Sequence, residues 1–235
     1  MLAFSGGGSI TVLATILGVS APANAIIFTT FTDRPAWEAA VGGSFNEEDF
    51  NSYTVDTSFD DGGSVNAGDF TLNGFGNCCT GSNKIDTSPF SFSDSVNGTP
   101  YVVGQVNNTG TTFFNITFSS AITSFGAEFE SISEFNSFDG TRITQLVADS
   151  ESTINIPEIS STGFFGIVGD SSFSTLSFQP GDSKFDRFGM DNVVHSSTSA
   201  SVPFEFSPTL GLLAVGGIWG VSRLRKRMAA SKITE

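Results

Sequence analysis

The chain has 235 residues, and its 24 Asp and Glu residues against 10 Lys and Arg residues give a net charge of −14. Phosphate backbones are bound by clustered Lys and Arg, so this balance excludes a nucleic-acid-binding function. The chain contains 25 Phe but only 2 Tyr residues, which indicates a dry hydrophobic core packed from phenylalanine.

The first 25 residues predict a secretory signal peptide. The apolar segment Ile10 to Val19 is far shorter than the roughly 20 residues that span a bilayer. Ala23 and Ala25 then occupy the small positions that an export peptidase reads, which predicts cleavage after Ala25. A positive segment is missing, since no Lys or Arg precedes Arg34, and a buried first strand or helix is the alternative interpretation.

One short helix is predicted after the signal peptide, at Arg34 to Val41. Thr32 or Asp33 can cap it, Pro35 lies in its first turn, and Gly42-Gly43 ends it. Beyond it, short runs rich in Phe, Ile, Val and Thr alternate with clusters of Gly, Asn, Asp and Ser. These runs predict strands at 26–31, 69–72, 102–106, 113–118, 125–130, 142–148, 152–156, 163–168, 175–178 and 185–194.

The alternation along these runs assigns residues to faces and, with the strand count, predicts the fold class. In the run 113–118 the even-numbered residues are apolar and share one face, while Phe113, Asn115 and Thr117 take the other. The pattern predicts an all-β chain with one domain over 26–195, an antiparallel β-sandwich of the jelly-roll, lectin-like type. A doubly wound fold is excluded because helices that could cover a parallel sheet are missing.

The two cysteines, Cys78 and Cys79, are adjacent in a Gly-rich segment. Neighbouring Cα atoms lie about 3.8 Å apart, below the usual range for a disulfide, so a bridge between them is strained. We expect this vicinal disulfide in an oxidising compartment, with free thiols and intermolecular links as alternatives. A zinc site is not expected, since two thiols lack partners and the single His195 is remote in sequence.

Calcium is the cofactor that the acidic body predicts, because a bound cation relieves repulsion between carboxylates. The candidate ligands form two groups. Glycines near the first group permit tight turns. The second group lies on the first and last strands, which are commonly neighbours in such sandwiches. Solvated acidic loops are the alternative interpretation of both groups. The candidate ligands are Asp56, Asp60 and Asp61, with Asp69 nearby, and Glu48 or Asp49 together with Asp191.

The sequence specifies no catalytic site. A serine triad would require His195, which lies at the edge of the predicted domain, and no Gly-x-Ser-x-Gly motif occurs. A carboxylate pair for glycoside cleavage stays open, because the distances between acidic residues are not set by their spacing in sequence. For sugar binding, Tyr53 and Tyr101 are the candidate stacking residues, with Arg142 and several Asn as polar partners.

A small polar linker over 196–202 leads to a tail over 203–235 that has three parts. The motif Pro203-Phe204-Glu205 is followed by an apolar run with four glycines, which favours a membrane helix over 209–222 rather than a soluble core helix. A basic cluster then follows, and such clusters collect on the cytoplasmic side of a membrane, which places the domain outside. This cluster consists of Arg223, Arg225, Lys226 and Arg227.

The tail resembles the PEP-CTERM sorting signal in its cyanobacterial Pro-Phe-Glu (PFE-CTERM) variant. The resemblance implies a membrane-embedded exosortase as processing partner, export to the cell envelope, outer surface or extracellular matrix, and a link to exopolysaccharide. The segments FTDRPAWEAAVGG and Phe188 to Val193 resemble PEP-CTERM ectodomains too, and suggest a lectin-like or carbohydrate-binding-like sandwich.

The sequence therefore predicts an exported, non-enzymatic surface or matrix protein. Its role would be structural or adhesive, in association with extracellular polysaccharide. A calcium-assisted carbohydrate-binding module is the alternative, and a secreted hydrolase is a third class.

Overall fold

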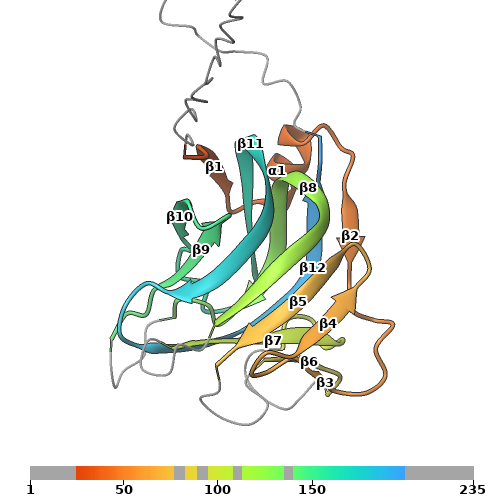
Figure 1. Cartoon of the computed structure of the whole chain (residues 1–235), viewed down its shortest axis with the longest axis vertical. Helices are drawn as coiled ribbons and strands as arrows, with labels where there is room; N and C mark the ends of the chain where they lie inside the picture. Colours follow the sequence, from red (N-terminus) through yellow and green to blue (C-terminus); the bar gives the residue numbers. More distant parts are fainter. Residues whose placement is uncertain (1–24, 77–82, 89–94, 108–112, 135–139, 199–235) are drawn as a thin grey trace, which may run out of the picture.

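Antiparallel strands form nearly all of the regular structure in this computed structural model, which describes residues 25–76, 83–88, 95–107, 113–134 and 140–198. Hydrogen-bonded pairing joins the twelve strands: eight form one continuous path, and β1, β2, β4 and β5 pair beside it. The path folds into two layers because the 18-residue strands β8 (Phe113–Glu130) and β11 (Gly163–Pro180) both bend near their middle (Figure 1). The predicted antiparallel β-sandwich is confirmed.

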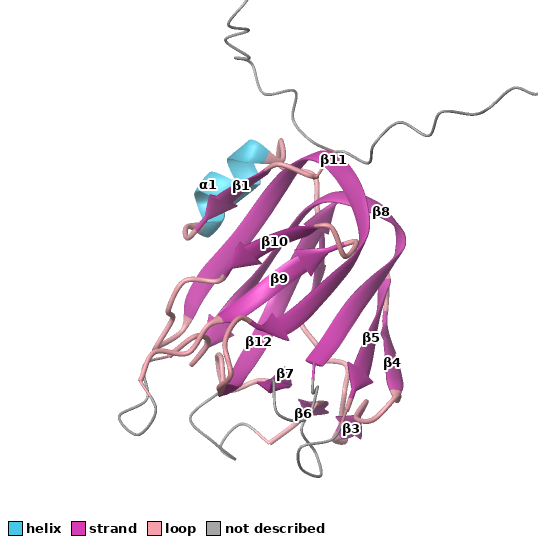
Figure 2. Cartoon of the chain, turned by 60° about the vertical axis from the view of Figure 1, so that its left-hand side comes forward, coloured by secondary structure: helices cyan, strands magenta, loops and turns pink. Residues whose placement is uncertain are grey.

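The front sheet contains the first half of β8 and the second half of β11. On the β8 side it is extended by β5 (Phe70–Phe75) and β4 (Ser64–Ala67). On the β11 side it is extended by β9 (Thr144–Ala148) and β10 (Ser152–Asn155), so that the whole layer can be followed in Figure 2.

The back sheet contains the other halves of β8 and β11, with β1 (Phe28–Phe31) on the outer edge of β11. On the other side of β8 lies β12 (Phe185–Ser196). The far edge of β12 pairs with both β7 (Tyr101–Asn107) and β2 (Asn46–Glu48). The layer then continues from β7 to the short strands β6 (Lys84–Asp86) and β3 (Thr57–Ser58).

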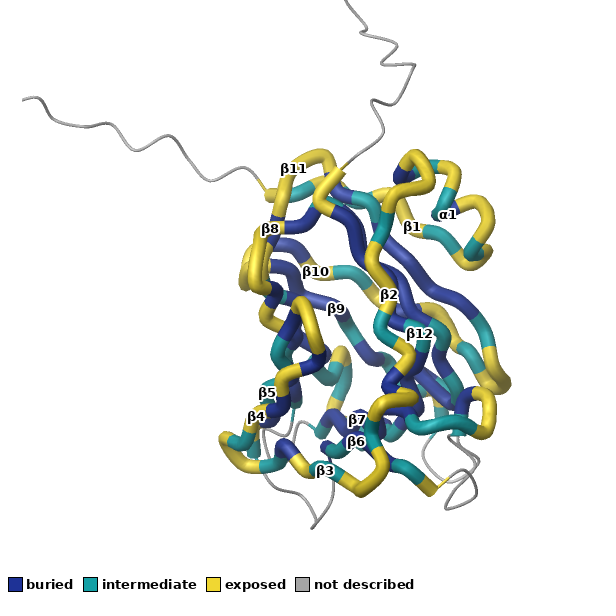
Figure 3. The backbone as a smooth tube through the Cα atoms, turned by 90° about the vertical axis from the view of Figure 1, so that its right-hand side faces the viewer, coloured by how far each residue is buried: buried dark blue, intermediate teal, exposed yellow. Residues whose placement is uncertain are grey.

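The core between the layers is packed mainly from phenylalanine, as the composition predicts. The Phe114 and Phe178 rings stack at 4.6 Å, and the ring of Phe188 lies 5.5 Å from that of Phe178. Each buried Phe contributes about 1.5–3 kcal/mol. Figure 3 shows the long buried stretches of β8, β11 and β12 and the exposed bends in the middle of β8 and β11. The fully buried rings are Phe50, Phe59, Phe70, Phe114, Phe125, Phe129, Phe165, Phe173, Phe178 and Phe188.

Helix α1 (Arg34–Ala40) lies outside the back sheet, beside β1 (Figure 2). Of the two predicted caps, Asp33 is the one used, since its carboxylate accepts a hydrogen bond from the Ala36 N–H at 2.9 Å. The Trp37 indole is fully buried and donates to the carbonyl of Ile167 at 3.2 Å. Gly166 makes this contact possible, because a Cβ at that position would lie 2.6 Å from the indole.

The predicted strands differ from the observed ones in two respects. The predicted pairs 113–118 with 125–130, and 163–168 with 175–178, are the halves of the continuous strands β8 and β11. The polar residues between the halves were interpreted as turns, yet they form bends within one strand. The short strands β2, β3, β4 and β6 were not predicted, because two to four mostly polar residues carry no clear alternation.

Several predicted features lie outside the described residues: signal peptide residues 1–24, Cys78 and Cys79, and the tail from residue 203, with Pro203, Phe204, Glu205 and the basic cluster. Within the ranges that the structure describes, no helix is long and apolar enough to cross a membrane. The segment 209–222 is not part of those ranges.

Candidate functional site

The outer side of the front sheet is a polar surface whose strands carry no charged residue among the outward-facing positions, and we call it the uncharged face. Asp149, in the turn after β9, borders it, with its carboxylate accepting from the Thr175 N–H at 2.8 Å. Alternate residues of the front-sheet strands point to the core, and the residues between them point outward. No described helix lies across this surface (Figure 2). The uncharged face consists of Ser64, Asn66, Thr71, Asn73, Phe75, Phe113, Asn115, Thr117, Gln145, Val147, Thr153, Asn155, Thr175, Ser177 and Gln179.

Strand register aligns these side chains in rows that cross the sheet. One row carries Asn73, Asn115 and Ser177 side by side and continues to Ser64 at one edge. Toward the other edge it passes through the apolar Val147 before it reaches Thr153. The adjacent row on one side is formed by threonine hydroxyls from β5, β8 and β11. Amide and hydroxyl groups therefore repeat at the strand spacing of about 4.8 Å.

Hydrogen bonds within the uncharged face hold some side chains in place and leave others available. The Asn73 amide donates to the Thr117 hydroxyl at 3.2 Å, and the Gln145 amide donates to the Asn155 oxygen at 2.8 Å. The side-chain oxygen of Asn115 is buried and accepts no hydrogen bond. A buried acceptor without a donor costs about 1–3 kcal/mol.

An aromatic pair borders the polar rows. The rings of Phe75 and Phe113 are stacked with centroids 4.7 Å apart and planes at 13°. Phe75 is 37% exposed, although most Phe side chains of this protein are in the core. An exposed flat ring beside hydroxyl and amide groups is a surface on which the CH face of a sugar can stack.

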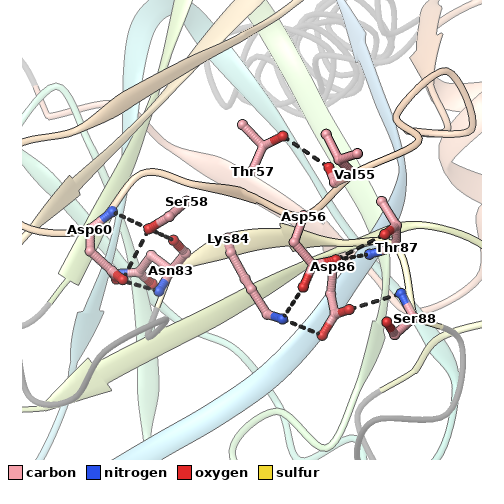
Figure 4. A network of polar contacts seen from close by, with 10 residues as sticks. All are labelled: Val55, Asp56, Thr57, Ser58, Asp60, Asn83, Lys84, Asp86, Thr87 and Ser88. Atoms are coloured by element: carbon pink, nitrogen blue, oxygen red, sulfur yellow. Dashed lines mark hydrogen bonds and ion pairs between the residues drawn. The ribbon is translucent and has the colours of Figure 1, made fainter.

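The predicted acidic group Asp56, Asp60 and Asp61 is divided among different partners (Figure 4). Asp56 accepts from the Lys84 ammonium at 2.7 Å and from the Thr87 N–H at 2.9 Å. These bonds, that of Lys84 above all, lower the pKa of Asp56 to about 2. Asp60 instead accepts from the Asn83 N–H at 2.6 Å, and Asp61 lies exposed in a turn. Asp56 and Asp60 thus bond residues in and beside β6, and the three carboxylates do not share a partner.

The second acidic group is also divided, although the strands are neighbours as expected. Strand β2 pairs with β12, with Glu48 opposite Val193. The Asp49 carboxylate, however, is bonded to the backbone N–H of Asn51 at 3.1 Å and to its amide at 2.9 Å. Asp191 points to the outer side of the back sheet, where it accepts from the Asn192 N–H at 2.7 Å.

Asp191 is the most perturbed carboxylate among these candidates. It is fully buried, and this burial raises its pKa to about 7, with repulsion from Glu128 adding to the effect. The hydroxyl of Thr99 also donates to it, at 3.2 Å. In the described part of the chain, no three His, Cys, Asp or Glu side chains are grouped as metal ligands. Calcium at either group therefore stays a prediction.

The predicted stacking tyrosines are not on the uncharged face. Tyr101 is fully buried against Val96 and Val103 on the back sheet, so it cannot meet a ligand. Tyr53 is half-buried, and its hydroxyl donates to the Asn66 carbonyl at 2.7 Å at the edge of the front sheet. Burial raises the pKa of Asp186, and the positive charge of Arg142 partly opposes this rise.

Sequence reasoning missed the uncharged face, although its signal was present in the alternation. The run 113–118 was assigned its two faces correctly, but only the apolar side was interpreted. The same alternation of core and polar residues occurs in β5 and in the second half of β11. The rows become visible only once the register between these distant strands is known.

No family model and no curated protein matches the chain. A solved structure of the family 29 carbohydrate-binding module CBM29-2 with mannohexaose is 15% identical, covers 62% of this chain and 93% of that one, and gives a TM-score of 0.36. The family 11 carbohydrate-binding module of the cellulosomal cellulase Lic26A-Cel5E of Clostridium thermocellum is 9% identical, covers 67% and 98%, and gives 0.29. At these scores the likenesses assign neither a family nor a ligand to this chain.

Proposed function

We propose that this protein is an exported, non-enzymatic module that binds an uncharged polysaccharide along the uncharged face. The observation that carries the proposal is that none of the described outward-facing strand residues of that face is charged in a chain of net charge −14, with Asp149 at its edge bonded to the Thr175 N–H. Acidic residues instead occupy turns, strand ends and the back sheet.

The chemistry of the face matches a chain of neutral sugars. Amide and hydroxyl rows offer donors and acceptors to hydroxyl groups. An extended glycan that crosses the strands meets polar side chains on most of them, and the Phe75–Phe113 pair can stack on a sugar ring. The overall negative charge repels an anionic polymer, so we expect a neutral one.

Export and surface attachment belong to the same proposal and are supported by the two termini. The Ala-x-Ala site ending at Ala25 is typical of secretion. The tail after residue 203 is typical of processing by an exosortase-like enzyme at the membrane. The module would then act at the cell surface or in the matrix, where polysaccharide is present.

The test is retention on immobilised polysaccharides, measured for the full chain by affinity electrophoresis or a pull-down. We expect retention by at least one neutral polymer from mannan, glucomannan, xylan and β-glucan, and none by alginate or polygalacturonate. Replacing Thr117 by Asp places a charge on the face, and we expect retention to fall about tenfold or more. Ser160→Asp adds the same charge to an exposed loop of the back sheet and is the matched control.

Stronger retention by the anionic polymers, or equal retention of Thr117→Asp and the parent chain, contradicts the assignment of the face. Detection of reducing ends released from any polymer contradicts a purely binding function.

A further inference from the structure

A cavity of about 540 Å³ lies at the end of the sandwich, apart from the uncharged face. It is lined by residues 43–46 at the start of β2, the bend of β8 (119–122), residues 195–198 at and after the end of β12, and Asp69. Its volume is within the range of roughly 300–1,000 Å³ that is usual for small-molecule sites. The lining is mainly hydroxyl and amide groups, with Phe45 and Ile122 as apolar parts.

The single histidine of the chain points into this cavity and is held rigidly. His195 is 6% exposed, and its ring lies 5.2 Å from that of Phe118 and 6.1 Å from that of Phe70. Nε2 lies 3.9 Å from Asp69 Oδ2, too far for a hydrogen bond. Among the described residues no group donates to or accepts from either ring nitrogen. Neither nitrogen is a buried atom that lacks a partner, so both keep hydrogen-bonding capacity that a ligand in the cavity can use.

Asp69 stands beside the histidine and is placed by two contacts. Its carboxylate accepts from the Asn46 amide at 2.6 Å, and its carbonyl accepts from the Ser119 N–H at 2.9 Å. The carboxylate side chain is 56% exposed, so it has lone pairs left for other donors. An aspartate with an adjacent amide is well suited to accept hydrogen bonds from two neighbouring hydroxyls of one ligand.

Hydrogen bonds and an aromatic contact fix the residues that line the cavity. The Ser196 hydroxyl donates to the Ser44 carbonyl at 2.6 Å and lies 2.9 Å from the Thr198 hydroxyl, which joins the end of β12 to the segment before β2. Phe45 is fixed by an edge contact with Trp37 at 5.6 Å. One wall is thus polar and ordered, and another is aromatic.

We propose that this cavity binds a single neutral sugar, such as the terminal residue of a glycan, independently of polymer binding on the uncharged face. Burial lowers the pKa of His195, so the ring is neutral at neutral pH, and the nearby carboxylate repels anions. A metal cation is disfavoured because Asp69 is the only carboxylate in the lining. Hydrolysis is not inferred, since no serine hydroxyl of the described residues is bonded to His195.

The single histidine gives a direct readout of binding. In proton–carbon NMR spectra of the tag-free full chain, one imidazole produces one set of ring signals. We expect the methyl glycosides of at least one of D-glucose, D-galactose and D-mannose to shift these signals, with a Kd of roughly millimolar order. No shift with any of the three sugars overturns the proposal, as does binding seen by calorimetry that leaves the His195 signals unmoved.

Two variants locate the sugar. Asp69→Asn removes the acceptor charge, and we expect affinity to fall about tenfold or more, while Asp61→Asn removes one charge from an exposed turn and should change nothing. Ser120→Trp fills the cavity and should abolish the shift, with Ser160→Trp as its exposed control. Circular dichroism checks that each variant is folded, and unchanged affinity in both cavity variants refutes the site.

The two proposed binding sites can be tested independently of each other. Thr117→Asp should lose polymer retention and keep the response of His195 to monosaccharide, and Asp69→Asn should do the reverse. If Asp69→Asn removes both, the cavity is an end of the polymer site and the proposal of an independent sugar site is wrong.

Discussion

Replacing Asp191 by Asn should stabilise the protein in a pH-dependent way. Burial raises the pKa of Asp191 to about 7, whereas in the unfolded chain the carboxyl has its ordinary value of 3.8. Between these values the folded state holds a proton that the unfolded state has released. The contribution of Asp191 to folding stability is therefore fully present below pH 3.8 and is lost as pH rises through about 7.

The size of the effect follows from the shift. A shift of about 3 pKa units corresponds to about 4 kcal/mol as an upper limit, and local relaxation reduces it to about 2 kcal/mol. Asn has the shape of the protonated acid, and its amide can donate to Glu128 across the strand pair. At about pH 8 we expect the melting temperature of Asp191→Asn to exceed that of the parent by about 4–8 °C.

The assay is thermal unfolding followed by circular dichroism from about pH 5 to pH 8. The gain from Asp191→Asn should fall by more than half from about pH 8 to about pH 5, because the folded parent takes up a proton over this range while the unfolded carboxyl stays ionised. A variant that is equally or less stable than the parent at the basic end refutes the reasoning, and so does a gain that does not depend on pH.

The remaining predictions concern the other acidic group, the aromatic pair and calcium. Asp56→Asn should show the opposite pH dependence, because Lys84 lowers the pKa of Asp56 to about 2. At neutral pH we expect the variant to lose about 1 kcal/mol of unfolding free energy, after allowance for solvent screening. In melts at acidic pH this loss should vanish as pH falls to about 2. Phe75→Ala should weaken polysaccharide retention about fivefold in affinity electrophoresis and leave the melting temperature nearly unchanged, and a strongly lowered melting temperature would show that the ring is structural. If calcium binds at Asp60 or Asp191, saturating calcium should stabilise the parent by about 2.7 kcal/mol at a hundredfold excess over Kd and have less effect on the Asn variants, whereas equal melting temperatures in calcium and in chelator contradict the prediction.

The pattern of neighbouring residues was sufficient to predict the helix and most strands. The features that it could not predict depend on pairing between strands that are distant in sequence. The cap at Asp33 and the faces of the run 113–118 depend on neighbouring residues, and both are confirmed. Whether 113–118 and 125–130 form two strands or one bent strand depends on partners far along the chain.

The candidate sites show the same limit. Asp56 and Asp60 are close in sequence, but Lys84 takes the first and Asn83 the second, so proximity along the chain did not create a shared site. The uncharged face and the group of His195 with Asp69 arise from strands that pair across long stretches of sequence. Single-sequence patterns contain the alternation of these residues but not the register that aligns them.

The two bent strands couple the unfolding of the two layers of the sandwich. Because β8 and β11 each contribute one half to either layer, neither sheet can separate without breaking hydrogen bonds in the other. Melting should thus be a single all-or-none transition, and slow hydrogen exchange should extend through both halves of these strands. Since the pairs β1–β11 and β2–β12 join opposite ends of the domain, the chain must be almost complete before it closes, and refolding should be slow for its size.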